Sequence, residues 1–206
     1  GAIYRTSLRG AAYVFARSAN VWSQQAYLTA SDGASSDQFG TSVAISNDGN
    51  TLVAGAGGHD VGANVNQGAA YVFVRSGVSW SQQSILTAAS GVAGDGFGAS
   101  AALYNNGSGV VIGANGRTVG ANAQQGAAYV FDRTANTWTQ QSVIAATGGG
   151  AGDLFGLSAS SSSNGSTLLI GAPSHQVGAN AGQGAAYVFF SPRINGVACT
   201  QALECN

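Results

Sequence analysis

A strict internal repeat constrains this chain more than any other feature of its sequence. The hexapeptide Gly-Ala-Ala-Tyr-Val-Phe occurs four times, and each occurrence starts 58 residues after the last, at Gly10, Gly68, Gly126 and Gly184. The period divides the chain into an N-terminal segment and successive units, with bounds 1–9, 10–67, 68–125, 126–183 and a partial 184–206. Periodicity without insertion or deletion predicts stacked or radially arranged supersecondary units.

Each unit contains four short segments with strand character. In the second unit they span 69–75, 80–88, 98–104 and 110–114, and they are rich in β-branched, aromatic or small apolar residues. Asn-Gly or Asp-Gly between the third and fourth segments supplies the positive φ of a tight hairpin turn. No sustained 3.6-residue apolar period occurs, so we expect little helix. The pattern predicts an all-β fold of tandem four-stranded antiparallel sheets, the blades of a β-propeller.

The first strand of every unit alternates bulky and small residues in a way that suits stacked sheets. The tyrosines Tyr13, Tyr71, Tyr129 and Tyr187 fall on one face, and the valine after each falls on the other. Three full units supply twelve strands, whereas closed propellers typically have four to eight blades. We therefore expect the propeller to be incomplete within one chain, with apolar ends that need a partner surface.

Composition excludes several classes of partner. Only 7% of residues are charged, there is no Lys, and the formal net charge is -1. Binding to nucleic acid or to an anionic membrane needs a basic patch, which this sequence does not offer. No apolar run approaches the roughly 18 residues that span a bilayer, so no membrane insertion is expected.

Cys199 and Cys205 are close enough in sequence for a C-terminal disulfide, which favours an oxidising compartment. The absence of Met at Gly1 suggests a processed or excised chain.

Several linked motifs together resemble a known family. Residues 39–56, Phe-Gly-Thr-Ser-Val-Ala-Ile-Ser-Asn-Asp-Gly-Asn-Thr-Leu-Val-Ala-Gly-Ala, resemble the FG-GAP repeat of integrin α-subunit propellers. The resemblance is closer to secreted bacterial FG-GAP proteins, whose units also combine a Gly-Ala-x-Tyr-Val-Phe strand with a Trp-x-Gln-Gln strand. It implies a β-propeller in an extracellular protein, with a role in adhesion, ligand binding or scaffolding and typically no catalysis.

One departure from the family concerns calcium. Integrin-type repeats commonly hold Ca²⁺ in an Asp-x-Asp-x-Asp-Gly loop, which is here reduced to short turns such as 47–50. A Ca²⁺ site needs six to eight oxygen ligands, several of them from carboxylates. The first turn has one Asp and the next two have none, so they cannot supply these ligands. We expect no cofactor, and Ca²⁺ is the one ion that the resemblance suggests.

Three recurring positions carry candidate functional residues. Two residues before each Phe-Gly pair stand Asp37, Asp95 and Asp153. They either bind a cation or polyol or, as we favour, cap a turn through a side-chain to backbone hydrogen bond. A second position holds His59, Arg117 and His175, which we interpret as a surface loop because its chemistry varies. The third position holds Trp22, Trp80 and Trp138, which fill gaps between sheets or, alternatively, stack on sugars.

These observations predict a non-enzymatic extracellular structural or adhesive module. The serine runs lack a Gly-x-Ser-x-Gly elbow and a nearby His, so nucleophilic catalysis has no support. A carbohydrate-binding lectin is the first alternative, and a fragment of a larger calcium-dependent adhesin is the second. The expected partners are further copies of the chain, bound head to tail, or a glycan or cell-surface protein.

The two ends of the chain suggest how copies meet. The segment 1–9 has strand character, with Ile3, Tyr4 and Leu8, but does not match the repeat. The partial unit 184–206 repeats a first strand with Tyr187 and Phe189 and then loses the pattern. We predict that the N-terminal segment of one copy completes the C-terminal blade of the next, in a ring or a filament.

Overall fold

The structure is a computed structural model that describes residues 9–190 and 202–204. Its strands form one two-stranded sheet and three four-stranded sheets, in which all neighbouring strands are antiparallel. The first sheet consists of β1 (Ala12–Ser18) and β2 (Val21–Leu28). The others comprise β3 (Val43–Ile45), β4 (Thr51–Ala56), β5 (Ala69–Ser76) and β6 (Ser79–Leu86); β7 (Phe97–Tyr104), β8 (Gly109–Ala114), β9 (Ala127–Thr134) and β10 (Thr137–Ile144); and β11 (Ser158–Ser161), β12 (Thr167–Ala172), β13 (Ala185–Phe190) and β14 (Ala202–Glu204).

The all-β, four-stranded antiparallel prediction is confirmed. In the described part of the chain the only helical element is a 3₁₀ turn, η1 (Asn105–Gly107), between β7 and β8. The strands run in chain order across each sheet, from β3 to β6, β7 to β10 and β11 to β14. The sheets do not close into a ring.

The sheets are out of phase with the sequence repeat. The four strands expected in the second unit are present as β5, β6, β7 and β8, but the first two belong to one sheet and the last two to the next. The reason is the antiparallel pairing of β4 with β5, which joins the fourth strand of one unit to the first strand of the following unit. Each four-stranded sheet therefore combines halves of two successive units.

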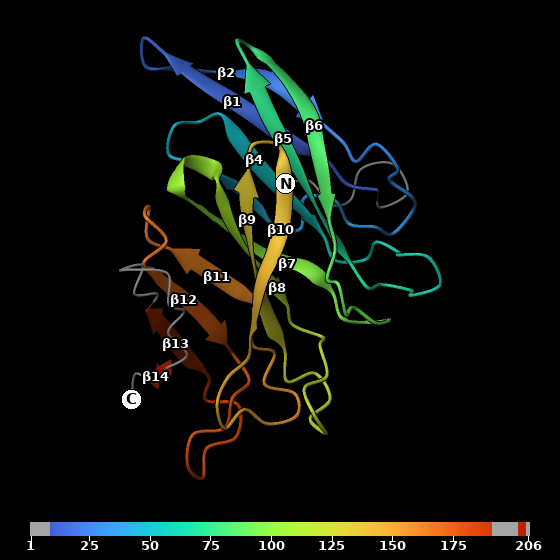
Figure 1. Ribbon diagram of the computed structural model, residues 1–206, viewed down its shortest axis with the longest axis vertical. Helices are drawn as coiled ribbons and strands as arrows, with labels where there is room; N and C mark the ends of the chain where they lie inside the picture. The colour runs from blue at the N-terminus through green and yellow to red at the C-terminus, as the bar shows by residue number, and fades with distance from the viewer. Residues whose placement is uncertain (1–8, 191–201, 205–206) are drawn as a thin grey trace.

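The sheets follow one another along the long axis of the molecule, from β1 and β2 at one end to β11–β14 at the other (Figure 1). Between the first two sheets, Val14 packs in one cluster with Tyr71 and Phe73. Between the next two, Val72 packs in one cluster with Tyr129. The tyrosine face of each sheet thus meets the valine face of the sheet before it. We call each such contact a seam.

The Phe-Gly pair fills the centre of every seam. Phe39, Phe97 and Phe155 are fully buried. Each ring lies edge-on to the tyrosine of the following first strand, with 5.4 Å between centroids in all three seams. The glycine that opens Gly-Ala-Ala-Tyr-Val-Phe lies directly against this position: a Cβ on Gly68, whose φ is +87°, would be 2.1 Å from the carbonyl oxygen of Phe97. Only glycine fits there.

The ends of the array differ from the sequence-based prediction. The last sheet already has four strands, because β14 pairs with β13 through three residues. Within residues 9–190 and 202–204 the two-stranded sheet is the first, in which β1 pairs with β2. Ile3, Tyr4, Leu8, Cys199 and Cys205 lie outside the described residues. In the described ranges no helix has the length and apolar character needed to cross a membrane.

Candidate functional site

The aspartate before each Phe-Gly pair is buried and caps a turn. Asp37, Asp95 and Asp153 are 2%, 1% and 3% exposed. Each carboxylate accepts the backbone N–H of the residue three positions earlier, at 2.7 to 2.9 Å. A buried carboxylate needs such partners, because removal of its charge from water is costly. These contacts fix the loops that lead into β3, β7 and β11.

The same carboxylates pair with the recurring His or Arg position. His59 Nδ1 lies 2.9 Å from Asp37, Arg117 Nη1 2.9 Å from Asp95, and His175 Nδ1 2.6 Å from Asp153. The three residues lie in loops, as predicted, but their side chains are paired with the aspartates and are only 14%, 21% and 17% exposed. The loop after the fourth strand folds back onto the aspartate turn, 22 residues earlier in the chain. The sequence signal was available: the variable position always holds a side chain that can donate to a carboxylate.

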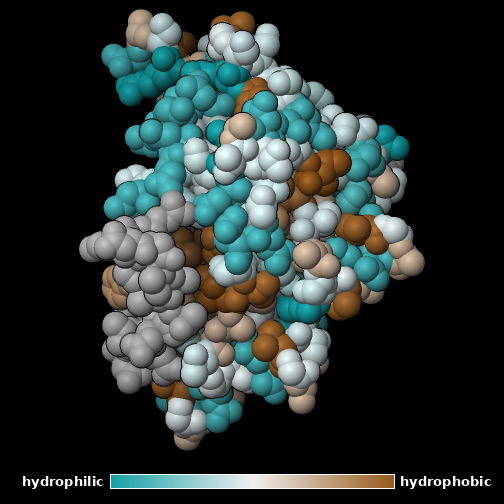
Figure 2. Space-filling model, in the orientation of Figure 1, coloured by the Kyte–Doolittle hydropathy of each residue, from teal (hydrophilic) through white to brown (hydrophobic). Residues whose placement is uncertain are grey.

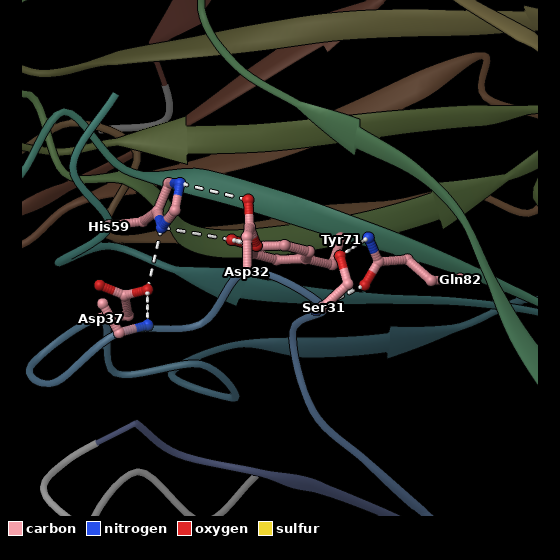
Figure 3. A network of polar contacts seen from close by, with 7 residues as sticks. Ser31, Asp32, Asp37, His59, Tyr71 and Gln82 are labelled. Carbon is pink, nitrogen blue, oxygen red and sulfur yellow. Dashed lines mark hydrogen bonds and ion pairs between the residues drawn. The ribbon is translucent and has the colours of Figure 1, made fainter. Parts of the chain in front are cut away.

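The first seam extends this pair into a larger polar network (Figure 3). Tyr71 donates its hydroxyl hydrogen to Asp32 at 2.8 Å, and its oxygen lies 3.3 Å from His59 Nδ1. Burial raises the pKa of Tyr71, and the hydrogen bond to the Asp32 carboxylate raises it further, so the phenol stays a donor. Later units have Ser90 and Gly148 at the position of Asp32, which makes this network particular to the first seam.

The contacts of this network hold two loops and the strand β5 together. The described contacts of His59 are to Asp37, Asp32 and the phenol of Tyr71. Carboxylates and a phenol hold the imidazole in place, whereas nucleophilic catalysis needs an imidazole that activates a hydroxyl or thiol. Among the residues that the structure describes, no group of three or more His, Cys, Asp and Glu could hold a metal ion.

Two of the three tryptophans bridge neighbouring sheets. Trp80 donates its indole N–H to Gln25 at 3.0 Å, and Trp138 donates to Gln83 at 3.2 Å. Both glutamines belong to the outer strand of the preceding sheet. Arg75 lies over the ring of Trp80 at 5.9 Å. Each indole therefore has a polar partner across the seam, and the same pattern repeats in the next sheet.

The first sheet exposes side chains that later sheets bury. Phe15 is 53% exposed, whereas its equivalents Phe73 and Phe131 are 3% and 4% exposed. Trp22 on β2 is 66% exposed. No sheet of the described residues lies before the tyrosine face of β1 and β2, and its aromatic side chains are exposed. We call this surface the N-terminal open face.

β3, at the edge of the second sheet, also has exposed side chains on the face toward the first sheet. Val43 and Ile45 of β3 are 47% and 55% exposed, although Leu103, the equivalent of Ile45, packs against the core of the second seam. The two strands that the first sheet lacks would lie over them. The N-terminal open face thus continues onto β3, the edge strand of the second sheet.

The last sheet is open on its valine face. Leu169 of β12 is 45% exposed, whereas its equivalents Val53 and Val111 are fully buried in seams. Tyr187, predicted to be an assembly residue, is instead 1% exposed and packs with Phe189 on Phe155 inside the last seam. Figure 2 shows apolar surface gathered in the lower half of the view, beside the residues drawn in grey. We call the surface around Leu169 the C-terminal open face.

Comparison with known proteins identifies the repeat. The family model described as FG-GAP repeat matches three times, at residues 22–73, 80–131 and 138–189. Each match begins at the tryptophan of one unit and ends at the phenylalanine of the next first strand, so it contains one seam. The search of curated proteins found no match.

Proposed function

The chain belongs to the FG-GAP repeat family, and from this membership and the open sheet ends we propose that it is a non-enzymatic extracellular structural or adhesive module whose copies assemble. FG-GAP repeats occur in adhesion and extracellular proteins, which supports the location and the general role. The polar networks of the seams support a structural role, because their residues bind one another.

One observation carries the assembly proposal: positions that are buried inside the array are exposed at both of its ends. Phe15, Ile45 and Leu169 are each about half exposed, and the equivalents of all three pack in seams. Exposed apolar surface of this kind is stabilised by burial, at about 25 cal/mol per Å². Since a sheet of the same type covers each of these positions inside the array, we propose a further copy of the chain as the partner.

The low charge of the chain leaves these ends unprotected. Natural edge strands usually carry Lys, Pro or inward-pointing charges that prevent pairing with other chains. This sequence has no Lys and two Pro in 206 residues. Arg17 lies near the end of β1, and its guanidinium donates to Asn20 at 2.7 Å. Association between copies is thus not opposed by charge.

Sedimentation velocity of the chain over a wide concentration range tests this proposal. We expect species of higher mass whose fraction rises with concentration and which resist moderate salt, because apolar surface and not charge holds them. The mass of one copy at every concentration would contradict the assembly. Electron microscopy of the same samples separates rings from filaments.

A lectin is the second candidate, and the exposure of Trp22 favours it. An open indole on a sheet surface offers a stacking platform for a sugar ring. Trp80 and Trp138 are committed to neighbouring sheets, so only Trp22 would take part. Binding on a glycan array that is lost in Trp22→Ala and retained in Trp138→Phe would support a lectin.

If the chain is part of a calcium-dependent adhesin, its melting temperature should fall in excess chelator, whereas a structural module without Ca²⁺ should show no change.

A further inference from the structure

The first strands at the two ends of the chain are interchangeable in sequence. Residues 10–15, which lead into and form most of β1, are identical to residues 184–189 of β13. In each complete sheet the first strand of a unit pairs with two neighbours, as β5 pairs with β4 and β6. Among the described residues β1 pairs with β2 alone and has no partner equivalent to β4, β8 or β12.

The outer hairpin of the last sheet differs from that of the first. In the part of the chain that the structure describes, β13 and β14 are paired through three residues, whereas β1 and β2 are paired through seven. The second strand of a unit normally carries Trp-x-Gln-Gln, but residues 196–199 at that position read Gly-Val-Ala-Cys. The partial last unit therefore has no tryptophan at the position of Trp80 and Trp138, which donate to glutamines of the preceding sheet.

We propose that the β1–β2 hairpin of one copy takes the place of β13 and β14 on β12 of a second copy. The shared sheet then has the order β11-β12-β1-β2, with the first two strands from one copy and the last two from the other. This inference rests on the assembly proposed above and names the strands that form it. The incoming hairpin displaces β13 and β14 of the second copy, and the strand that enters next to β12 begins with the same sequence as the strand that leaves.

The register of the shared sheet follows from the repeat. In the last sheet Leu168 is opposite Phe189 and Ile170 is opposite Tyr187. Phe15 and Tyr13 occupy the same repeat positions as Phe189 and Tyr187. The incoming β1 therefore presents identical side chains to β12, and the exchange neither adds nor removes a strand pair on that side.

The contacts that β1 and β2 lack in a single copy are provided by the second. In the last seam the ring of Phe155 lies 6.0 Å from that of Phe189. After exchange Phe155 would cover Phe15, which is now half exposed. The hydrogen bonds from tryptophan to glutamine would also continue across the junction. Gln25 and Gln83 accept from the tryptophans of the following sheets. Gln141 occupies the same repeat position, and in the assembly Trp22 of the second copy would be its partner.

The same exchange covers the remaining exposed residues at the two ends. In the second seam Leu103 packs in the cluster that contains Val53. Ile45 is the equivalent of Leu103 and Leu169 that of Val53, so the sheet that follows the shared one would place Ile45 of one copy against Leu169 of the other. A single arrangement of the two copies would therefore bury Phe15, Ile45 and Leu169, which are exposed in one copy.

Exchange also accounts for the number of sheets. Each copy contributes two complete sheets of its own, β3–β6 and β7–β10, and each junction adds one shared sheet. Two copies with two junctions would have six sheets, which lies within the range of closed propellers. If the rotation between sheets does not close, the same junction repeats into a filament.

A disulfide lock tests whether β13 must leave β12. Thr167 on β12 is opposite Phe190 on β13, and cross-strand partners about 4.5–5.5 Å apart are within the span of a disulfide. The variant combines Thr167→Cys and Phe190→Cys with Cys199→Ser and Cys205→Ser. We expect the oxidised protein to have the mass of one copy and the reduced protein to assemble like the Cys199→Ser/Cys205→Ser parent.

The matched control is the same lock two sheets earlier in the array. Thr51 and Val74 are paired at the equivalent positions of β4 and β5, which no exchange involves. The Thr51→Cys/Val74→Cys variant in the same background should assemble whether oxidised or reduced. If the parent assembles and the oxidised 167/190 lock assembles equally well, the exchange is wrong although assembly stands. If the parent does not assemble, the proposed function itself fails.

A cross-link between copies provides the positive test. Ala16 occupies the repeat position of Phe190, so in the shared sheet Ala16 of one copy is opposite Thr167 of the other. Within one copy β1 and β12 lie in sheets at opposite ends of the array (Figure 1). Ala16→Cys/Thr167→Cys in the serine background should give covalent multiples of the chain on mild oxidation. Monomer alone on a denaturing gel, from a sample that assembles, would overturn the exchange.

Discussion

The close approach of successive sheets depends on a glycine that recurs at one position of the repeat, and its replacement by alanine gives a graded test. A Cβ on Gly55 would lie 1.9 Å from the carbonyl oxygen of Gly98, and one on Gly113 would lie 1.8 Å from that of Gly156. Both oxygens belong to the backbone that enters the next sheet. On Gly171, in the last sheet, the nearest atom is instead the side-chain oxygen of Ser158 at 2.3 Å, which can rotate away.

The magnitude follows from the distance to be gained. Since Cβ atoms essentially never lie within 3.0 Å of such neighbours, the sheets around Gly55 would have to separate by about 1 Å. Overpacking of this kind costs about 1–3 kcal/mol. The hydrogen bond that Ser42 donates to Gly98 across the same contact, at 2.8 Å, would be lost at a cost of about 1 kcal/mol. We expect Gly55→Ala and Gly113→Ala to lose about 2–4 kcal/mol, or on the order of 10 °C in melting temperature.

Urea unfolding followed by circular dichroism measures the three variants at one low protein concentration, at which the chain is a single copy and no second copy covers the last sheet. Gly171→Ala should remain within about 1 kcal/mol of the parent, because it meets only a rotatable side chain. Equal losses at Gly55, Gly113 and Gly171 would refute the reasoning. The glycines would then be required by their strands and not by the approach of the next sheet.

Three further changes probe the polar contacts of the seams. Arg117→His should cost less than about 1 kcal/mol in urea unfolding, because other units use His there, whereas Arg117→Leu leaves the Asp95 carboxylate unpaired and should cost about 3–5 kcal/mol. Burial raises the pKa of Tyr71 in the folded state, so its contribution is complete below the ordinary tyrosine pKa of about 10 and is lost as pH rises above it. Tyr71→Phe should flatten the loss of stability measured between pH 9 and 11, and an unchanged slope would contradict that assignment. Trp80→Phe should lose about 1 kcal/mol with its indole hydrogen bond, whereas Trp22→Phe should lose almost nothing in the same assay.

Much of the fold could be predicted from the sequence because a strict repeat multiplies every local signal. The alternation in Ala-Ala-Tyr-Val-Phe assigns Tyr71 and Val72 to opposite faces, and these faces indeed belong to different seams. The Asn-Gly turn that joins β7 and β8 was readable from its residues, and Asn106 and Gly107 both have positive φ.

The phase of the sheets could not be predicted in the same way. A period reads the same from any starting point, so the repeat alone does not say whether the strand 51–56 belongs with the strands before it or after it. The deciding contact is the pairing of β4 with β5 across the loop 57–68, which is non-local. For this reason the sequence predicts an incomplete sheet at the C-terminal end, whereas in the part of the chain that the structure describes the two-stranded sheet is the N-terminal one.

The pairing of Asp37 with His59 also escaped sequence reasoning. Both positions were recognised as recurrent, but their contact depends on a loop that folds back over 22 residues. Arg117 at the second position suggested tolerance of any surface residue, although His and Arg share the ability to donate to a buried carboxylate. In a repeat protein, joint variation within one chemical class is therefore a signal of pairing.

Sedimentation velocity of two end variants, alone and mixed, tests the account most directly. Phe15 and Leu169 are 53% and 45% exposed, so Phe15→Asp and Leu169→Asp should fold as single copies. The first variant cannot donate β1 and the second cannot seat the following sheet, so each alone should have the mass of one copy. An equimolar mixture retains one intact junction and should form a complex of two copies. A mixture that remains at the mass of one copy, or a Phe15→Asp protein that assembles alone, would contradict the claim that the two open faces bind each other.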